Sequence, residues 1–229
     1  MTGTGRARGW PAAVVFDLDG TLVDSAPDIA SALNAAMQPY ALAPFTVDDV
    51  HGMIGAGSFV LVQRAIAAKG VALADDEQAR LFQRFMGFYQ EISAEGAGLY
   101  FGAVDLLRDL RASGVRLALC TNKPAAVTDI AIDALGIADY FDCVVGGCDE
   151  LAKKPAPDML LAALAGIGAA PADAVMIGDS AADVGAARAA SVRVLVSRTG
   201  YSKTLADRLG ADGVYDALAD VPGLIARLK

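Results

Sequence analysis

The stretch AAVVFDLDGTLV, residues 12–23, decides the fold of this chain. Its first five residues are all apolar, which is typical of a parallel strand buried on both faces. Asp17 and Asp19 follow this strand, and ligands bind at the carboxyl ends of strands in an open parallel sheet. The two carboxylates offer hard oxygen ligands to a cation such as Mg²⁺, and an aspartate there can also act as a nucleophile. The alternative is that Asp19 and Gly20 only form a turn.

Five further apolar runs predict strands, and helical patterns lie between most of them. The predicted strands are 12–17, 115–120, 142–146, 173–178, 192–196 and 213–216. The predicted helices lie near 102–113, 125–135, 157–165, 181–190 and 203–209. This alternation indicates βαβ units. We therefore expect an α/β fold with a doubly wound parallel sheet, a Rossmann-like core with helices on both faces.

The chain between residues 22 and 97 breaks the alternation, because it contains helical patterns and no convincing strand. A helix is expected to begin near Ser25, since this capping residue is followed by Pro27 and Asp28. Amphipathic helices are also expected near 57–69 and 76–94. We therefore predict a helical cap domain inserted into the α/β core. The predicted core is 1–21 and 98–229, the predicted cap is 22–97, and the predicted hinges are 22–25 and 95–101.

Polar residues follow other predicted strands. Thr121 and Asn122 could hold phosphate oxygens, or they could cap a helix. Lys154 precedes a proline that favours extended backbone, and its ammonium could neutralise a phosphoryl group or lie in a solvated loop. Asp179 could act at the site or cap the next helix, and Asp183 would face the site from that helix. Because the carboxyl ends of parallel strands open on one crevice, we expect these side chains to meet there.

The composition describes an acidic globular chain. Of 229 residues, 55% are hydrophobic, and the net charge is −8, which argues against general nucleic-acid binding. The three cysteines form no C-x-x-C pair, which suits a reducing compartment. Residues 1–10 lack the apolar segment of a signal peptide, and no apolar run is long enough to span a membrane. We therefore expect a cytoplasmic protein that binds neither nucleic acid nor membranes.

Four motifs together resemble those of the haloacid dehalogenase-like (HAD) phosphohydrolase superfamily. They are DLDGT at 17–21, Thr121-Asn122, Lys154-Pro155 and GDSAAD at 178–183. The resemblance spans roughly residues 12–220, and the helical insertion is similar to the cap of this superfamily. Its dehalogenases and phosphonoacetaldehyde hydrolases lack an aspartate at the position of Asp19. The chain departs from the pattern at Phe101-Gly102 and Ser191, where Pro-Gly and glycine are common, which affects linker geometry more than chemistry.

The resemblance implies a Mg²⁺-dependent phosphatase that works through an aspartyl-phosphate. Asp17 would be the nucleophile and Asp19 the general acid and base. Mg²⁺ would be held by Asp17, Asp179 and the backbone carbonyl of Asp19, while Asp183 would support Lys154 or bound water. The residues that would bind or stabilise the phosphoryl group are Gly20, Thr121, Asn122 and Lys154.

The resemblance implies that the substrate is a small phosphorylated metabolite and that the cap residues select it. Residues 24–28 and 55–57 are most similar to phosphoglycolate phosphatases, so 2-phosphoglycolate is the expected ester. A pyrophosphatase, a sugar-phosphate phosphatase and a phosphomutase stay open, although Ile29 replaces the histidine that mutases usually carry. A non-catalytic phosphoacceptor or binding module is the alternative from another class, and the oligomeric state is open. The possible cap contacts to substrate are His51, Gly55, Gly57 and Ser58.

Overall fold

The computed structural model describes residues 11–93 and 98–228, and its centre is a six-stranded parallel sheet. The strand order is β5-β4-β1-β6-β7-β8. The strands are β1 (Ala13–Phe16), β4 (Arg116–Pro124), β5 (Cys143–Gly147), β6 (Ala174–Gly178), β7 (Arg193–Ser197) and β8 (Gly213–Tyr215). All six predicted strands are present. The order reverses at β1, which pairs with β4 on one side and β6 on the other, and this switch point is where doubly wound sheets bind ligands.

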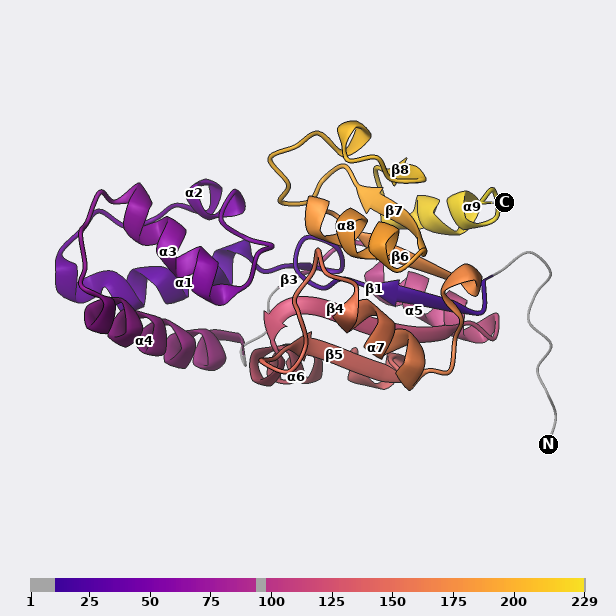
Figure 1. Cartoon of the computed structure of the whole chain (residues 1–229), viewed down its shortest axis with the longest axis horizontal. Helices are drawn as coiled ribbons and strands as arrows, with labels where there is room; N and C mark the ends of the chain where they lie inside the picture. The colour runs from indigo at the N-terminus through magenta and orange to yellow at the C-terminus, as the bar shows by residue number, and fades with distance from the viewer. Residues whose placement is uncertain (1–10, 94–97, 229) are drawn as a thin grey trace.

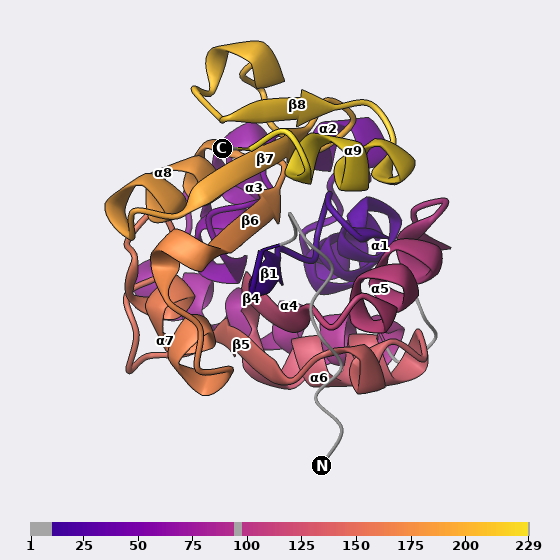
Figure 2. The ribbon, with the colours of Figure 1, turned by 90° about the vertical axis from the view of Figure 1, so that its right-hand side faces the viewer.

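Helices cover both faces of the sheet (Figure 2), which confirms the α/β prediction. Alternate residues of β1 point to opposite faces: Val14 and Phe16 enter one apolar cluster, and Ala13 and Val15 enter the other. The first cluster includes residues from α5 (Ala103–Ala112), α6 (Ala125–Ala134) and α9 (Val221–Ile225). The second includes residues from α7 (Asp158–Gly166) and α8 (Ala181–Ala189). Burial on both faces explains why β1 is apolar without alternation.

Four helices form a separate layer at one end of the molecule (Figure 1). They are α1 (Ala26–Met37), α2 (Val47–His51), α3 (Ser58–Ala68) and α4 (Asp75–Ser93). They pack around a third apolar cluster that contains Leu33, Leu61 and Phe85, and that also takes in Val127 of α6 and Tyr201 from the loop after β7. Two short antiparallel strands, β2 (Val23–Asp24) and β3 (Gly98–Leu99), join this layer to the sheet.

The helices α1 to α4 lie within the predicted cap, 22–97, and the domain limits stay a prediction. The predicted boundary at residue 97 and part of the hinge 95–101 lie outside the described residues, as does the segment 1–10. In the part of the chain that the structure describes, no helix is long and apolar enough to cross a membrane.

One predicted helix is wrong. Residues 203–209 contain only a 3₁₀ turn, η4 (Ala206–Arg208), because Ala206 is the one buried residue there, Leu209 is only partly buried, and Leu205 remains 66% exposed. Without an apolar face to bury, so short a segment has little to stabilise it as a helix. The other 3₁₀ turns are η1 (Gln38–Tyr40), η2 (Ala138–Tyr140), η3 (Pro171–Asp173) and η5 (Leu218–Asp220). The short elements α2, α9, β2 and β3 were not predicted, and β4 continues past the predicted end at 120.

Candidate active site

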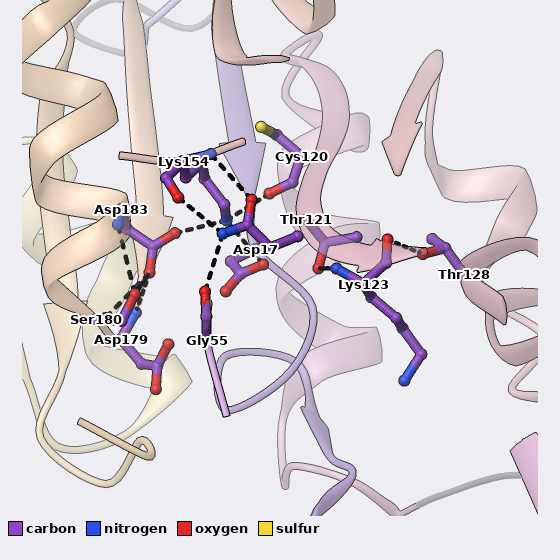
Figure 3. Close-up of polar contacts among 11 residues, drawn as sticks. Asp17, Gly55, Cys120, Thr121, Lys123, Thr128, Lys154, Asp179, Ser180 and Asp183 are labelled. Atoms are coloured by element: carbon purple, nitrogen blue, oxygen red, sulfur yellow. Dashed lines mark hydrogen bonds and ion pairs between the residues drawn. The ribbon is translucent and has the colours of Figure 1, made fainter. Parts of the chain in front are cut away.

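The candidate site forms where β1, β4 and β6 end side by side. Asp17 follows β1, Asp179 follows β6, and Thr121 and Asn122 lie in the last part of β4. Lys154 enters from the loop after β5. Each of these five side chains belongs to a residue that is less than a tenth exposed, and Figure 3 shows Asp17, Lys154, Asp179 and Asp183 gathered in one cluster. The topology therefore brings together residues that are up to 166 positions apart in sequence.

Lys154 is the central cation of this cluster. Its Nζ lies 2.9 Å from Asp17 Oδ1 and 2.7 Å from Asp183 Oδ1, and it donates to the Cys120 carbonyl at 2.7 Å. Burial lowers the pKa of Lys154, but the two carboxylates outweigh that effect and hold the pKa above its ordinary value. The ammonium is therefore charged at neutral pH and fixed beside Asp17, where a phosphoryl group bound to Asp17 would meet it.

Asn122 holds the lysine loop in place. Its Oδ1 accepts from the Lys154 backbone N–H at 3.0 Å, and its Nδ2 donates to the carbonyls of Lys154 and Gly55, both at 2.9 Å. The side-chain amide is thus committed to protein partners, and the expected phosphate contact of Asn122 depends on its backbone N–H. Thr121 Oγ1 accepts from the backbone N–H of Lys123 at 3.2 Å, so its hydroxyl hydrogen can still be donated.

Asp183 joins the start of α8 to the lysine. Ser180 is the N-cap residue and forms a capping box with Asp183, whose Oδ2 accepts from Ser180 Oγ at 2.6 Å and from Ser180 N at 3.0 Å. The same oxygen accepts from Asp179 N at 3.2 Å. Gly178 makes room for this arrangement, because a Cβ there would come within 2.4 Å of the Asp183 carboxyl carbon. Asp183 is fully buried and supports Lys154 and Asp179 simultaneously.

The carboxylates fit a divalent cation. Asp17, Asp179 and Asp183 each offer an oxygen within 4.8 Å of the others. Burial raises the pKa of Asp17 to about 7, with Asp183 and Asp19 adding to the rise and Lys154 opposing it. Burial, together with the charges of Asp183 and Asp17, raises the pKa of Asp179 well above its ordinary value. A cluster with more buried carboxylates than ammonium groups gains stability when a hard cation binds to its oxygens.

Asp19 lies apart from this acidic cluster. Its Oδ1 forms an ion pair with Lys123 Nζ at 3.1 Å, and its side chain is 12% exposed. The next residue, Gly20, has φ +83°, and a Cβ there would come within 2.6 Å of Asp179 Oδ2. A glycine is therefore needed both for the left-handed backbone and for the close approach of Asp179.

A small cavity lies between this site and the helical layer, with a volume of about 30 Å³. Such a volume holds water but not a phosphate ester. Gly55, Gly57 and Ser58 line the cavity, and their contact with substrate stays a prediction. His51 is not among its lining residues; its ring stacks on Tyr201, with ring centres 5.2 Å apart.

Three residues of the site have no counterpart in the sequence-based prediction. Lys123 pairs with Asp19 and contacts the hydroxyl of Tyr89, which comes from α4. Tyr201 donates its backbone N–H to Asp179 Oδ2 at 2.6 Å and its hydroxyl to Asp24 at 2.7 Å. Lys123 could have been predicted as a site residue, because it directly follows Thr121 and Asn122 in the sequence. Tyr89 and Tyr201 carry no local signal, since only the tertiary fold brings them to the site.

Comparison with known proteins shows the family of this chain. Residues 11–191 match the family model of the haloacid dehalogenase-like hydrolases. The phosphoglycolate phosphatase of Rhodospirillum rubrum is 44% identical over 92% of this chain and 89% of its own length. That of Escherichia coli K12 is 37% identical over 91% and 90%. A crystal structure of a predicted phosphoglycolate phosphatase from Haemophilus somnus 129pt superposes with a TM-score of 0.88 at 30% identity, covering 94% of this chain and 98% of that one. The chain belongs to the haloacid dehalogenase-like hydrolase family.

Proposed function

We propose that this protein is a Mg²⁺-dependent phosphatase that hydrolyses 2-phosphoglycolate to glycolate and phosphate through an aspartyl-phosphate. The observation that carries the proposal is the buried cluster of Asp17, Lys154, Asp179 and Asp183 at the switch point of the sheet. The phosphoglycolate phosphatases that align over nine-tenths of the chain support the choice of ester.

Asp17 is the proposed nucleophile. Its carboxylate attacks phosphorus while the bond between phosphorus and the leaving oxygen breaks, roughly in line. Lys154, held 2.9 Å from Asp17 Oδ1, offsets negative charge on the phosphoryl oxygens. The backbone N–H of Asn122 and the hydroxyl of Thr121 would donate to the same oxygens. Mg²⁺, held by Asp17, Asp179 and the Asp19 carbonyl, would neutralise further charge on the phosphoryl group.

Asp19 is the proposed general acid and base. It gives a proton to the leaving oxygen in the first step and accepts one from the attacking water in the second. That water breaks the aspartyl-phosphate bond, releases phosphate and restores Asp17. Asp183 takes no proton in this scheme, because its oxygens are occupied by Lys154, Ser180 and the backbone of Asp179.

Opening and closing of the helical layer completes the proposal. The cavity of about 30 Å³ is too small for the ester, so the layer must move away to admit it and close again for the reaction. The short strands β2 and β3 are the proposed hinges, and residues 22–97 the proposed cap. Residues Gly55, Gly57 and Ser58 are the proposed cap contacts to substrate. From the acidic composition and the unpaired cysteines, we also propose a cytoplasmic location.

The test is a panel of phosphate esters assayed with and without Mg²⁺. It includes 2-phosphoglycolate, glucose 6-phosphate and pyrophosphate, with wild-type protein, Asp17→Asn and the exposed control Asp129→Asn. We expect 2-phosphoglycolate to give the highest kcat/KM in Mg²⁺, Asp17→Asn to lose turnover, and Asp129→Asn to match wild type. Normal turnover by Asp17→Asn would refute the nucleophile. A preference for pyrophosphate or the sugar ester would refute the substrate.

A further inference from the structure

A second buried lysine faces the cavity from the end of β4. Lys123 is 6% exposed, and its Nζ lies 3.1 Å from Asp19 Oδ1. The same nitrogen contacts the Tyr89 hydroxyl and lies 4.3 Å from the centre of the Tyr89 ring. In Figure 3 the Lys123 side chain extends away from Lys154, so the two ammonium groups serve different parts of the site. The role of Lys123 is not explained by the attack of Asp17 on phosphorus.

In the proposed mechanism, the leaving group lies on the Lys123 side of the cavity. In an in-line reaction the leaving oxygen departs opposite Asp17, beside the acid Asp19. The wall there is largely apolar and includes Ile29, Ile54 and Leu61. Among the described residues that line the cavity, Lys123 is the sole cation. A negatively charged leaving group would be poorly stabilised in this apolar enclosure unless it met that cation.

The two lysines of the site differ in the groups that they contact. Lys154 already has two carboxylate neighbours, Asp17 and Asp183. Lys123 pairs with the carboxylate of Asp19 and contacts the phenol of Tyr89. An ammonium group has three hydrogens, so a third acceptor can bind. Burial raises the pKa of Tyr89, with Asp19 and Asp28 adding to the rise, so the phenol keeps its hydrogen and is also a donor.

We infer that Lys123 is a specificity-determining residue that binds the carboxylate of the leaving group, assisted by the hydroxyl of Tyr89. This inference deepens the proposed function and depends on it. Lys123 comes from the sheet and Tyr89 from α4 of the helical layer, so the two donors meet only when the layer is closed. An ester with an anionic leaving group thereby stabilises the closed enzyme. A neutral ester of the same size lacks this interaction.

The test compares two esters that differ only at the carboxylate. They are 2-phosphoglycolate and 2-hydroxyethyl phosphate, whose hydroxymethyl group replaces the carboxylate. We expect Lys123→Met to lower the preference, the ratio of the two kcat/KM values, by about 10- to 100-fold, as for a lost hydrogen bond to a charged group. The ratio cancels any effect that reaches both esters through Asp19. Lys123→Arg should restore part of the preference, and Tyr89→Phe should lower it severalfold. Lys69→Met, on the cap surface, is the matched control.

The outcomes separate this inference from the proposed function. If wild type hydrolyses 2-phosphoglycolate no better than 2-hydroxyethyl phosphate, the proposed substrate is wrong. If wild type prefers 2-phosphoglycolate and Lys123→Met keeps that ratio, the proposed substrate stands and the role of Lys123 is refuted. Circular dichroism checks the fold of each variant. If Lys123→Met does not fold, Lys123→Gln and Tyr89→Phe decide the question, and unchanged ratios in both would refute the inference.

Discussion

Replacing Asp17 by asparagine should stabilise the metal-free protein at alkaline pH while abolishing catalysis. Burial raises the pKa of Asp17 from 3.8 to about 7, even though Lys154 opposes the rise. That difference corresponds to roughly 4 kcal/mol of unfolding free energy, because each pKa unit is about 1.4 kcal/mol. Asparagine removes the buried charge, and Lys154 keeps Asp183 at 2.7 Å as its counter-ion. At pH 8 the unfolding free energy of Asp17→Asn should therefore exceed that of wild type by somewhat less than this value.

The sign of the pH dependence follows from the direction of the pKa. Below 3.8 the carboxyl is protonated in folded and unfolded chains alike, so Asp17 adds no cost. As the pH rises toward 7 the unfolded chain releases its proton first, and the folded wild-type protein loses stability relative to it. The difference in unfolding free energy between Asp17→Asn and wild type should therefore grow from acid to neutral pH and then level off.

Urea unfolding in a chelator, at about pH 5, 6 and 8, measures this difference. Added Mg²⁺ should then stabilise wild type and reverse the order, because the cation binds the ionised carboxylate. Asp129→Asn provides the baseline for loss of an exposed charge. A difference that stays flat across this pH range, or a variant less stable than wild type at pH 8 without metal, would refute the account of Asp17.

Three further predictions concern stability and local opening. Ser180→Ala should lower the unfolding free energy by about 1 kcal/mol, since it removes the N-cap of α8 and the 2.6 Å partner of Asp183; urea unfolding checks it. Phe85→Ala should cost about 3–5 kcal/mol by opening a cavity in the helical layer, and a smaller loss would contradict its burial. Tyr201→Phe removes the hydroxyl that accepts a 3.1 Å hydrogen bond from the Ala26 backbone N–H. Hydrogen exchange at the Ala26 amide should therefore become faster, and an unchanged exchange rate would count against this contact.

Most of the sheet could be predicted from the sequence, because its strands are buried on both faces and read as continuous apolar runs. Val14 and Val15 show the principle, since they enter the clusters on opposite faces of the sheet. The meeting of Asp17 with Asp179 followed from the rule that parallel strand ends share one edge. The prediction of a helix over 203–209 was wrong, because the helical pattern of residue types does not show how much apolar surface the segment buries in the fold.

The unpredicted parts of the site come from contacts between distant elements. Tyr201 reaches Asp24 across 177 positions, and Lys123 reaches Asp19 across 104. Tyr89 approaches Lys123 only because α4 packs against α6, the helix that follows β4. Pair contacts of this kind leave no periodic pattern in a single sequence, so the partner of each residue is visible only once the chain is folded.

Val127 gives the movement of the helical layer a thermal signature. This residue of α6 is fully buried in the apolar cluster of the helical layer, alongside Phe85. Opening the layer must therefore bring apolar surface into water, and exposure of apolar surface raises the heat capacity. Ligand binding that closes the layer should accordingly carry a negative heat-capacity change, and its enthalpy should become more favourable on warming. Temperature, as well as substrate concentration, would then set the fraction of closed molecules.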